Sequence, residues 1–315
     1  MSEGYRICVI IPAFNEADII GGTLASVAAE LNKLELDFRI CVVDDGSGDD
    51  TWQAVREASR RLPGRMEGIR FSRNFGKDAA IVAGLGEIKA DVYLVMDADG
   101  QHPPELIPRF VAEWRRGKVD IVNGIKSGRQ HDSRLKRLMS ASFNRTFRAL
   151  SGLDLNQASD FILLSRRAAE AILACGDYSL FFRGLSRWVG FTQTNLFFEV
   201  PPRNYGCGKW LPVRLVTYAV NALLLYSNVP LYLIILIGGL ALFVSIFLGV
   251  KVLVYFFLGE VPSGYSSLIL ISLISFSSIM TALGCIGLYV KTTLDHVKGR
   301  PRYIVMEKFI PPDDL

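Results

Sequence analysis

The sequence predicts an α/β domain with a mostly parallel sheet, followed by an amphipathic segment and two helices that can span a membrane. In the first two thirds of the chain, short runs rich in Val and Ile alternate with segments of helical periodicity, a pattern typical of right-handed βαβ units. Toward the carboxyl end, two long tracts are almost free of charged residues. With 315 residues, 50% of them hydrophobic, the chain is long enough for a sizeable core as well as both tracts.

The expected strands and helices of the sheet domain alternate along the chain. We expect strands at Arg6–Ile11, Phe38–Asp44, Gly68–Phe71, Val92–Met96 and Val119–Val122. We expect helices at Glu16–Asn32, Asp50–Leu62, Lys77–Lys89 and Pro104–Arg116. In open sheets of this kind, ligands bind beyond the carboxyl ends of the strands, so a functional site is expected at that edge.

Polar clusters follow four of the expected strands. Each cluster alone has an ordinary explanation, because Asp, Asn, Ser and Gly are common in turns and helix caps. Four clusters at one edge of a sheet instead favour a binding site. The clusters are Asn15–Glu16, Asp44–Ser47, Ser72–Asn74 and Asp97–Asp99.

The two apolar tracts, Val229–Leu258 and Ser266–Val290, each exceed the roughly 20 residues that cross a bilayer. We interpret them as a hairpin of transmembrane helices joined by a turn, with Lys251 extending its side chain toward the interface. The turn has no Lys or Arg, whereas the segment after Val290 has several, which predicts cytoplasmic termini. No secretory signal is recognisable at the amino terminus. We expect a multi-pass protein of the cytoplasmic membrane whose main domain stays inside.

Two further segments are predicted to face the membrane. Ser133–Leu150 has apolar residues at helical spacing, several Arg and Lys, and no acidic residue. A helix packed on the core with a solvated basic face is the alternative, and the neighbouring apolar tracts favour the interfacial helix. Trp210–Asn228 is also amphipathic and leads directly into the first tract.

Charge and cysteine usage exclude several classes of function. A net charge of +4 without a basic run interleaved with aromatic residues argues against nucleic-acid binding. The five cysteines are widely spaced and form no CxxC pair, which fits reduced thiols rather than a disulfide framework or a zinc site. The three histidines are too scattered for a zinc centre, so we expect a solvated or capping role for each, His102 included.

The sequence Asp97–Ala98–Asp99 is the candidate metal site. Two carboxylates separated by one residue, where a buried strand ends, can reach a common cation or its bound waters. Oxygen ligands of this kind suit Mg²⁺ or Mn²⁺, which bridge diphosphates and neutralise charge on a leaving group. The position of this pattern, after the strand Val92–Met96 and before Gly100–Glu105, favours such a cation site.

Four motifs resemble, in order and spacing, those of the inverting family 2 glycosyltransferases. They are Ile10–Glu16, Val43–Ser47, Ser72–Lys77 and Asp97–Glu105. The sequence is most similar to the branch of dolichol-phosphate mannose synthase and the bacterial polyprenyl-phosphate glucosyltransferases, including Ser159–Phe161 and the carboxy-terminal hairpin. The resemblance implies a GT-A domain over residues 1–208, a juxtamembrane helix over 209–228, transmembrane helices over 229–258 and 266–290, and a cytoplasmic tail over 291–315.

The resemblance also implies roles for residues on the donor side. Lys77 would lie near the donor phosphates, where its ammonium could counter the charge of the departing diphosphate; a solvated lysine at a helix start is the alternative. Mg²⁺ or Mn²⁺ would lie among Asp97, Asp99 and Gln101. The nucleotide would contact Pro12, Phe14, Glu16 and Asp45.

On the acceptor side, Ser159–Asp160 matches the family position at the acceptor end of the pocket. Asp160 is a candidate catalytic residue, either as a general base or by orienting a sugar hydroxyl or an arginine, with a structural cap as the alternative. A phosphate acceptor is already largely dianionic at neutral pH, since its second pKa is near ~6, and it needs cations more than a base. The candidate cations are Lys126, Arg129, Arg203 and Lys209.

Three positions depart from patterns of related enzymes. Gly208 stands where the family often has Ser or Thr, and Ile162 stands where many relatives have Arg. Leu185–Trp188 resembles the QxxRW element of processive polysaccharide synthases, but Gly184 occupies the Gln position. We expect Arg187 and Trp188 to be packing or interface residues.

The expected reaction is the inverting, metal-dependent transfer of one hexose from a nucleotide sugar to the phosphate of a polyprenyl phosphate. UDP-glucose is favoured over GDP-mannose as the donor. Two rivals stay open, namely a sugar-extending or processive transferase of the same fold and a catalytically silent membrane scaffold. The glycines of the apolar tracts are too common in membrane helices to establish a homo-oligomer, which also stays open.

Overall fold

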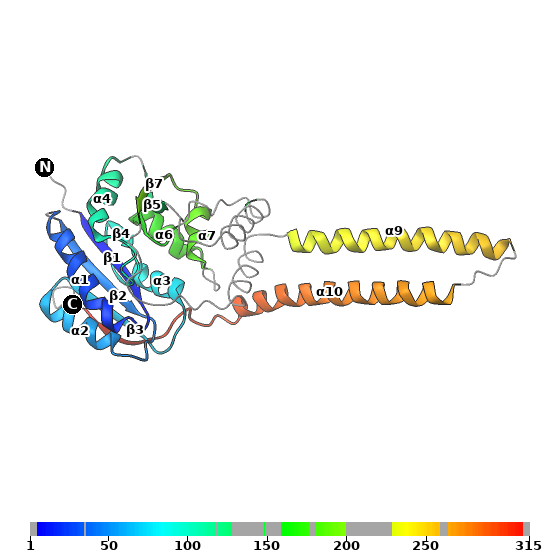
Figure 1. The fold of residues 1–315 in the computed structure, drawn as a ribbon, viewed down its shortest axis with the longest axis horizontal. Helices are drawn as coiled ribbons and strands as arrows, with labels where there is room; N and C mark the ends of the chain where they lie inside the picture. The colour runs from blue at the N-terminus through cyan, green and yellow to red at the C-terminus, as the bar shows by residue number, and fades with distance from the viewer. Residues whose placement is uncertain are drawn as a thin grey trace. The chain divides into compact units, whose positions relative to one another are not determined.

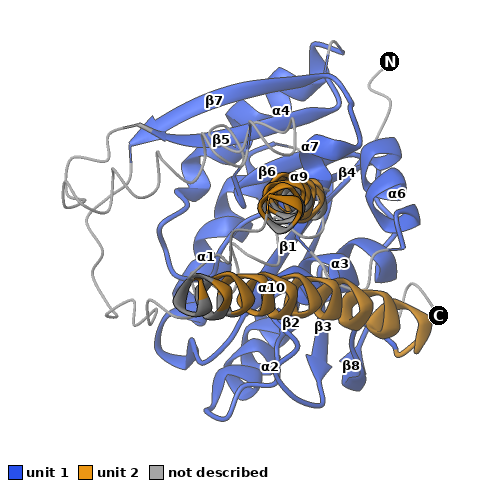
Figure 2. Ribbon diagram, turned by 90° about the vertical axis from the view of Figure 1, so that its right-hand side faces the viewer, with its two compact units in different colours: residues 1–215, 301–315 blue, residues 216–300 orange. Residues whose placement is uncertain are grey.

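The computed structural model describes residues 5–34, 36–117, 119–127, 148, 159–176, 181–199, 229–258 and 264–310. The chain divides into two compact units, one of Met1–Leu215 with Pro301–Leu315 and one of Val216–Arg300 (Figure 2). Apart from Arg148, the predicted basic helix Ser133–Leu150 lies outside the described residues, as does the predicted amphipathic segment Trp210–Asn228.

The first unit is built on an eight-stranded sheet in the order β7-β5-β6-β4-β1-β2-β3-β8 (Figure 1). The central pairs β4-β1, β1-β2 and β2-β3 are parallel, while β6 and β8 pair antiparallel to their neighbours. The predicted α/β class with a mostly parallel sheet is thus confirmed. The strands are β1 Arg6–Ala13, β2 Asp37–Asp44, β3 Met66–Phe71, β4 Val92–Val95, β5 Ile121–Ser127, β6 Ile162–Ser165, β7 Gln193–Glu199 and β8 Val305–Phe309.

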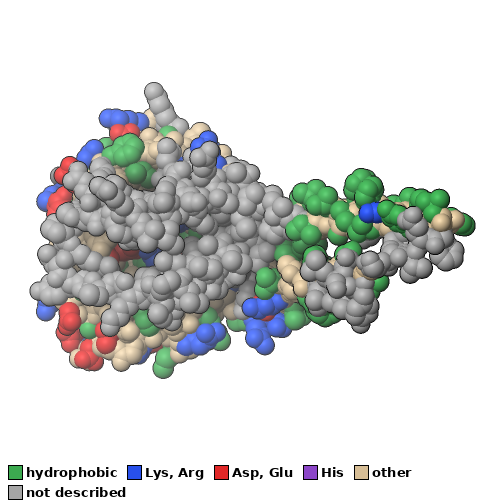
Figure 3. All heavy atoms as spheres, turned by 45° about the vertical axis from the view of Figure 1, so that its right-hand side comes forward, with side chains coloured by type: hydrophobic (Ala, Val, Ile, Leu, Met, Phe, Trp, Pro, Cys, Tyr) green, Lys and Arg blue, Asp and Glu red, His purple; other side chains and the backbone are tan. Residues whose placement is uncertain are grey.

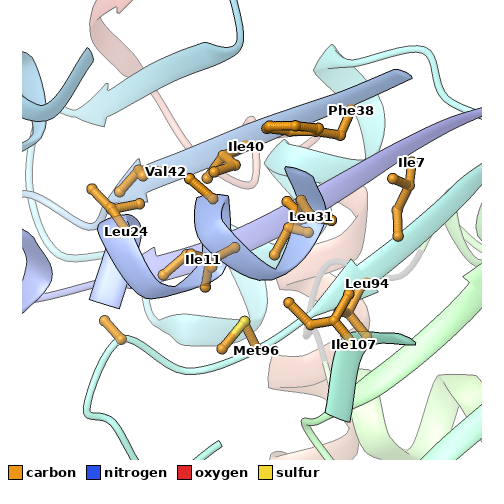
Figure 4. Packing of buried hydrophobic residues seen from close by; sticks show 14 of the residues in the cluster. Ile7, Ile11, Leu24, Leu31, Phe38, Ile40, Val42, Leu94, Met96 and Ile107 are labelled. Atoms are coloured by element: carbon orange, nitrogen blue, oxygen red, sulfur yellow. The ribbon is translucent and has the colours of Figure 1, made fainter. Parts of the chain in front are cut away.

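Helices cover both faces of this sheet. Successive residues of a strand point to opposite faces, so Val9 and Ile11 join one buried cluster while Cys8 and Ile10 join the other. The first cluster includes residues of α1, α2 and α4, of which Figure 4 labels Leu24 and Leu31 of α1 and Ile107 of α4. The second cluster includes residues of α3, α6 and α7. The helices are α1 Ala17–Asn32, α2 Thr51–Arg61, α3 Lys77–Glu87, the 3₁₀ turn η1 Pro104–Leu106, α4 Ile107–Arg115, α6 Arg166–Ala174 and α7 Phe182–Trp188.

The alternation predicted up to the fourth helix is confirmed, with element ends that differ from the predicted ones by at most two residues. The fifth strand was predicted at Val119–Val122. It is found later in the chain, at Ile121–Ser127. Strands β6, β7 and β8 and helices α6 and α7 were not predicted.

The second unit contains helices α9 (Val229–Phe257) and α10 (Tyr265–Val297). Many of their large apolar side chains are exposed, and Figure 3 shows hydrophobic side chains gathered over this unit. Among the described residues, one helical segment, Ile274–Val297, is long and apolar enough to span a membrane, and the apolar segment Ile234–Leu248 is shorter. Both tracts are therefore helical, and a hairpin with two spans stays a proposal.

Residues predicted to lie in a carboxy-terminal tail belong in part to the sheet. Helix α10 runs past Val290 to Val297, and β8 then pairs antiparallel with β3. The Glu307 carboxylate of β8 accepts a hydrogen bond from Trp52 Nε1 at 2.8 Å and pairs with Arg56 at 3.0 Å. Lys308 pairs with Glu87 of α3 at 2.7 Å. The end of the chain is thus part of the first unit.

Gly68→Ala should destabilise the first unit, because a Cβ at Gly68 would overlap the ring of Phe309, which packs on Trp52. We expect the free energy of unfolding in denaturant to fall by about 1–3 kcal/mol, as for other overpacked sites. In a Phe309→Ala background the same change should have little further effect. Gly22→Ala on the exposed face of α1, where a Cβ meets no atom, is the control and should not destabilise. An equal loss with and without Phe309 would contradict the explanation.

Candidate active site

The loops that follow β1 and β2 are tied together at the carboxyl edge of the sheet. Asn15, with a positive φ of 56°, accepts a hydrogen bond from Gly48 N at 3.0 Å through its side chain. Its own N–H donates to Ser47 Oγ at 2.9 Å, and Glu16 N–H donates to Thr51 Oγ1 at 2.8 Å. These bonds fix the segment that carries the predicted nucleotide-binding residues. Of those residues, Pro12 is buried at the end of β1, whereas Phe14 is 45% exposed.

Asp45, predicted to contact the nucleotide, is buried and holds the loop before α3. Its carboxylate accepts hydrogen bonds from Phe75 N at 2.7 Å and Gly76 N at 3.0 Å. Burial raises the pKa of Asp45 to about 6, against the effect of these two bonds. Next to it, Gly46 has a positive φ of 69°, and a Cβ there would overlap the backbone of Arg73. A contact of Asp45 with a nucleotide stays a prediction.

Lys77, the first residue of α3, joins two acidic residues from other parts of the chain. Its Nζ lies 2.5 Å from Asp97 Oδ1, in the loop after β4, and 2.8 Å from Asp160 Oδ2, just before β6. Burial lowers the pKa of Lys77, but the two carboxylates outweigh burial and raise the pKa overall. The ammonium therefore stays charged, and three of the four residues predicted to be catalytic are in direct contact.

Asp160 is also held by Arg183 of α7. The guanidinium donates from Nε to Asp160 Oδ1 at 2.6 Å and from Nη2 to Oδ2 at 2.7 Å, and the Asp160 side chain is only 12% exposed. Burial alone would raise the pKa of Asp160, but Lys77 and Arg183 hold it well below its usual range. Of the roles considered for Asp160, pairing with an arginine is thus present in the structure. Arg183 itself was not predicted.

Asp78, a second residue missed by the sequence analysis, follows Lys77 and links α3 to α7. Its carboxylate accepts a hydrogen bond from the Phe182 N–H, at the start of the helix that carries Arg183. Burial, together with the neighbouring Asp160 charge, raises the pKa of Asp78 to about 6. Asp78 therefore helps to place Arg183 beside Asp160.

Asp99 and Gln101 lie beside this cluster, where the sequence predicts a metal. Gln101 N donates to Asp99 Oδ1 at 3.0 Å, and Gln101 Oε1 accepts from Lys126 Nζ at 2.9 Å. The described residues contain no group of three or more His, Cys, Asp or Glu suited to a metal. A cation would depend on two carboxylates and one amide, a set of oxygen donors that fits Mg²⁺ or Mn²⁺ when water and phosphate complete the coordination.

His102 is buried, so of the two roles expected for it, solvated or capping, the solvated role is wrong. Only 3% of it is exposed, its Nδ1 accepts a hydrogen bond from Asp97 N at 2.9 Å, and its ring stacks on Phe161. Burial lowers the pKa of His102 to about 4. Trp188 is 61% exposed, which contradicts packing in the first unit and leaves the interface role as a proposal.

Of the four cations predicted to bind the lipid phosphate, one lies among the residues that the structure describes. Lys126, at the end of β5, lies beside Gln101, and burial lowers its pKa. Arg129, Arg203 and Lys209 lie outside the described residues.

Comparison with known proteins decides the family. Residues 8–186 match the protein family described as glycosyl transferase family 2. The chain belongs to this family. It is 32% identical to CsbB, a Bacillus subtilis (strain 168) protein named as a glycosyltransferase, over 100% of this chain and 95% of CsbB.

Two further likenesses concern the whole chain and the fold. The chain is 29% identical, over 95% of its length and 89% of the relative, to the undecaprenyl-phosphate 4-deoxy-4-formamido-L-arabinose transferase of Pseudomonas savastanoi pv. phaseolicola (strain 1448A / Race 6). The glucosyl-3-phosphoglycerate synthase of Mycobacterium tuberculosis, solved in complex with UDP, matches 70% of this chain and 79% of its own with a TM-score of 0.50. At 20% identity the match concerns the fold, which is GT-A-like as predicted.

Asp78→Asn should make this family 2 glycosyltransferase more stable above about pH 6. The folded-state pKa of about 6 exceeds the ordinary value of 3.8, so the contribution of Asp78 is greatest at low pH and is lost as pH rises through 6. Asn keeps an acceptor for Phe182 without the charge. In urea unfolding near pH ~7.5, we expect a gain of about 1–3 kcal/mol that disappears near pH ~4.

Asp18→Asn is the matched control, because Asp18 is an exposed carboxylate in the first turn of α1. It should not show the gain at neutral pH. A gain of equal size at both pH values in the Asp78 variant would contradict the assignment of the buried charge.

Proposed function

We propose that the chain transfers one hexose from a nucleotide sugar to the phosphate of a polyprenyl phosphate, with inversion. The observation that carries this proposal is the ion pairing of Asp160 with Lys77 and Arg183. A carboxylate whose pKa lies far below its usual range is a poor general base. A sugar hydroxyl would need such a base, whereas a phosphate monoester is already largely dianionic above pH ~6. The site therefore favours a phosphate acceptor.

In the proposed reaction, an oxygen of the lipid phosphate attacks the anomeric carbon of the donor from the face opposite the nucleoside diphosphate. The new carbon–oxygen bond forms as the bond to the diphosphate breaks, and the electron pair leaves with the diphosphate, so the configuration inverts. Lys77 stabilises the developing negative charge. Bringing a soluble donor and a lipid acceptor together is the main contribution of the protein.

The remaining site residues are assigned as binding groups. Mg²⁺ or Mn²⁺, held by Asp97, Asp99 and Gln101, would neutralise the charge of the diphosphate. We assign the nucleotide to Pro12, Phe14, Glu16 and Asp45. We assign the lipid phosphate to Lys126, Arg129, Arg203 and Lys209.

The acceptor and donor are proposed on different grounds. The name of the Pseudomonas relative, which aligns with nearly the whole chain, includes undecaprenyl phosphate, and this supports a polyprenyl phosphate acceptor. For the donor we rank UDP-glucose before GDP-mannose. Because that relative transfers 4-deoxy-4-formamido-L-arabinose, the nucleotide derivative of this sugar belongs in the same test.

We further propose that both helices of the second unit span the membrane, with the termini and the catalytic unit on the cytoplasmic side. The apolar character of α9 and α10 and the absence of Lys and Arg between them support this topology. A span brings the enzyme to the surface where a polyprenyl phosphate resides. The amphipathic segment of residues 209–228 would lie at that surface.

The test is to incubate the purified full chain in detergent with Mg²⁺ or Mn²⁺, a short-chain polyprenyl phosphate and the nucleotide sugars named above. Mass spectrometry of the lipid should show one added hexose from one donor, and Asp99→Asn should give none. Repeated addition would favour the sugar-extending rival. Donor binding without product on any acceptor would favour the silent scaffold.

Asp160→Asn should lower the rate without removing a titrating base. Loss of the ion pairs with Lys77 and Arg183 should reduce kcat by about 10- to 100-fold. The fall in rate below pH ~6 should remain, because it reflects protonation of the acceptor phosphate. Since Asp78 also has a pKa of about 6, Asp78→Asn is the control that separates its titration from that of the acceptor. Disappearance of the acidic limb in the Asp160 variant alone would contradict the proposal.

A further inference from the structure

His102 contacts both parts of the chain that carry the acidic partners of Lys77. On one side, its Nδ1 accepts the backbone N–H of Asp97 at 2.9 Å. On the other side, its ring lies flat against the ring of Phe161, with centroids 4.6 Å apart and an angle of 9° between the planes. Phe161 directly follows Asp160 in the chain. One buried side chain thus lies against both carboxylate segments.

The surroundings leave the imidazole little freedom to move. Only 3% of His102 is exposed, and the edge of Phe198 of β7 approaches its ring with a centroid distance of 6.3 Å. Phe161 is fully buried and packs on Phe110 of α4. An imidazole held in this way presents its Nδ1 lone pair in a fixed direction, toward the Asp97 amide.

The bond also defines the chemical state of the ring. An amide N–H can donate only to an unprotonated nitrogen, so His102 is neutral with its proton on Nε2. The Asp97 N–H belongs to the loop in which β4 ends, and a buried N–H without an acceptor is costly. The loop is therefore held in the conformation that directs the Asp97 carboxylate to Lys77.

We propose that His102 is a positioning residue for the reaction, acting through the backbone of Asp97 and, more weakly, through Phe161 on Asp160. It touches neither donor nor acceptor in this role. Its effect is to keep the two carboxylates at the separation at which Lys77 can contact both, 2.5 and 2.8 Å from its Nζ. The expected effect of His102 on turnover rests on the proposed function. The expected effect of His102 on the Asp97 amide rests on geometry alone.

Two substitutions separate the hydrogen bond from the ring stacking. His102→Asn keeps an acceptor, because Asn Oδ1 is attached at the same distance along the side chain as His Nδ1, but it removes the ring. His102→Phe keeps a ring on Phe161 and removes the acceptor. If the hydrogen bond positions Asp97, the Phe variant should lose about 10- to 100-fold in kcat, with the KM for the donor within about threefold of wild type. The Asn variant should keep kcat within about threefold of wild type.

The activity measurement has two outcomes that overturn the inference. One is a Phe variant with the kcat of the wild type. The other is an Asn variant impaired as strongly as the Phe variant, which would make His102 a packing residue. Thermal unfolding of each variant, recorded alongside, identifies a loss of activity that is only a loss of folded protein.

A measurement without turnover separates this inference from the proposed function. Hydrogen exchange of the Asp97 amide should be slow in the wild type and in His102→Asn, and at least about 10-fold faster in His102→Phe. If the wild type gives no lipid product, the proposed function fails while the exchange result still decides the role of His102. Equal exchange in all three proteins would overturn the positioning role even if transfer is observed.

Discussion

The ammonium of Lys77 between Asp97 and Asp160 is the interaction on which the site depends. It joins the start of α3, the loop after β4 and the segment before β6, which are distant in the sequence. Burying a charge without a partner is costly, so moving Lys77 away would leave the Asp97 carboxylate without this cation and Asp160 with Arg183 in place of two cations. Arg183 adds a second positive charge to Asp160 and completes a cluster of two carboxylates and two cations.

Buried side-chain acceptors bind a backbone N–H in the segments of three of the four cluster residues, namely Lys77, Arg183 and Asp97. Asp45 accepts from Phe75 and Gly76, immediately before Lys77, and Asp78 accepts from Phe182, immediately before Arg183. His102 accepts from Asp97 itself. The side chains of Asp45, Asp78 and His102 thus help to determine where Lys77, Arg183 and Asp97 lie. Their shifted pKa values follow from the same burial that makes them effective as rigid acceptors.

The sequence allowed the central sheet and three of the four cluster residues to be predicted, because the strands leave a local pattern and the three residues lie in contiguous motifs. A strand buried on both faces gives a continuous apolar run, such as that of β1, and a motif such as Asp97–Asp99 is contiguous. Arg183 has no such pattern, since its partner lies 23 residues earlier and nothing between them marks the pairing. His102 was misjudged because its neighbours are polar or Pro, while the aromatic residues that bury it come from other segments. Strand β8 is five residues long, with Glu and Lys in it, and its hydrophobic face is completed by Trp52 only in the fold.

The segment that follows α10 also contacts the loop before Lys77, at the edge of the sheet where β3 and β8 pair. Ser72 N–H, at the start of the loop that leads to Lys77, donates to Ile304 O at 2.9 Å, and Tyr303 stacks on Phe71 at a centroid distance of 5.0 Å. That loop is therefore held at Phe75 and Gly76 by Asp45, and at Ser72 by Ile304, which follows α10 in the chain. A loop fixed by one partner can pivot about it, whereas a loop fixed by two has a defined position. The segment after the apolar helix thus contributes to the placement of Lys77, although it contains none of the residues assigned to the reaction.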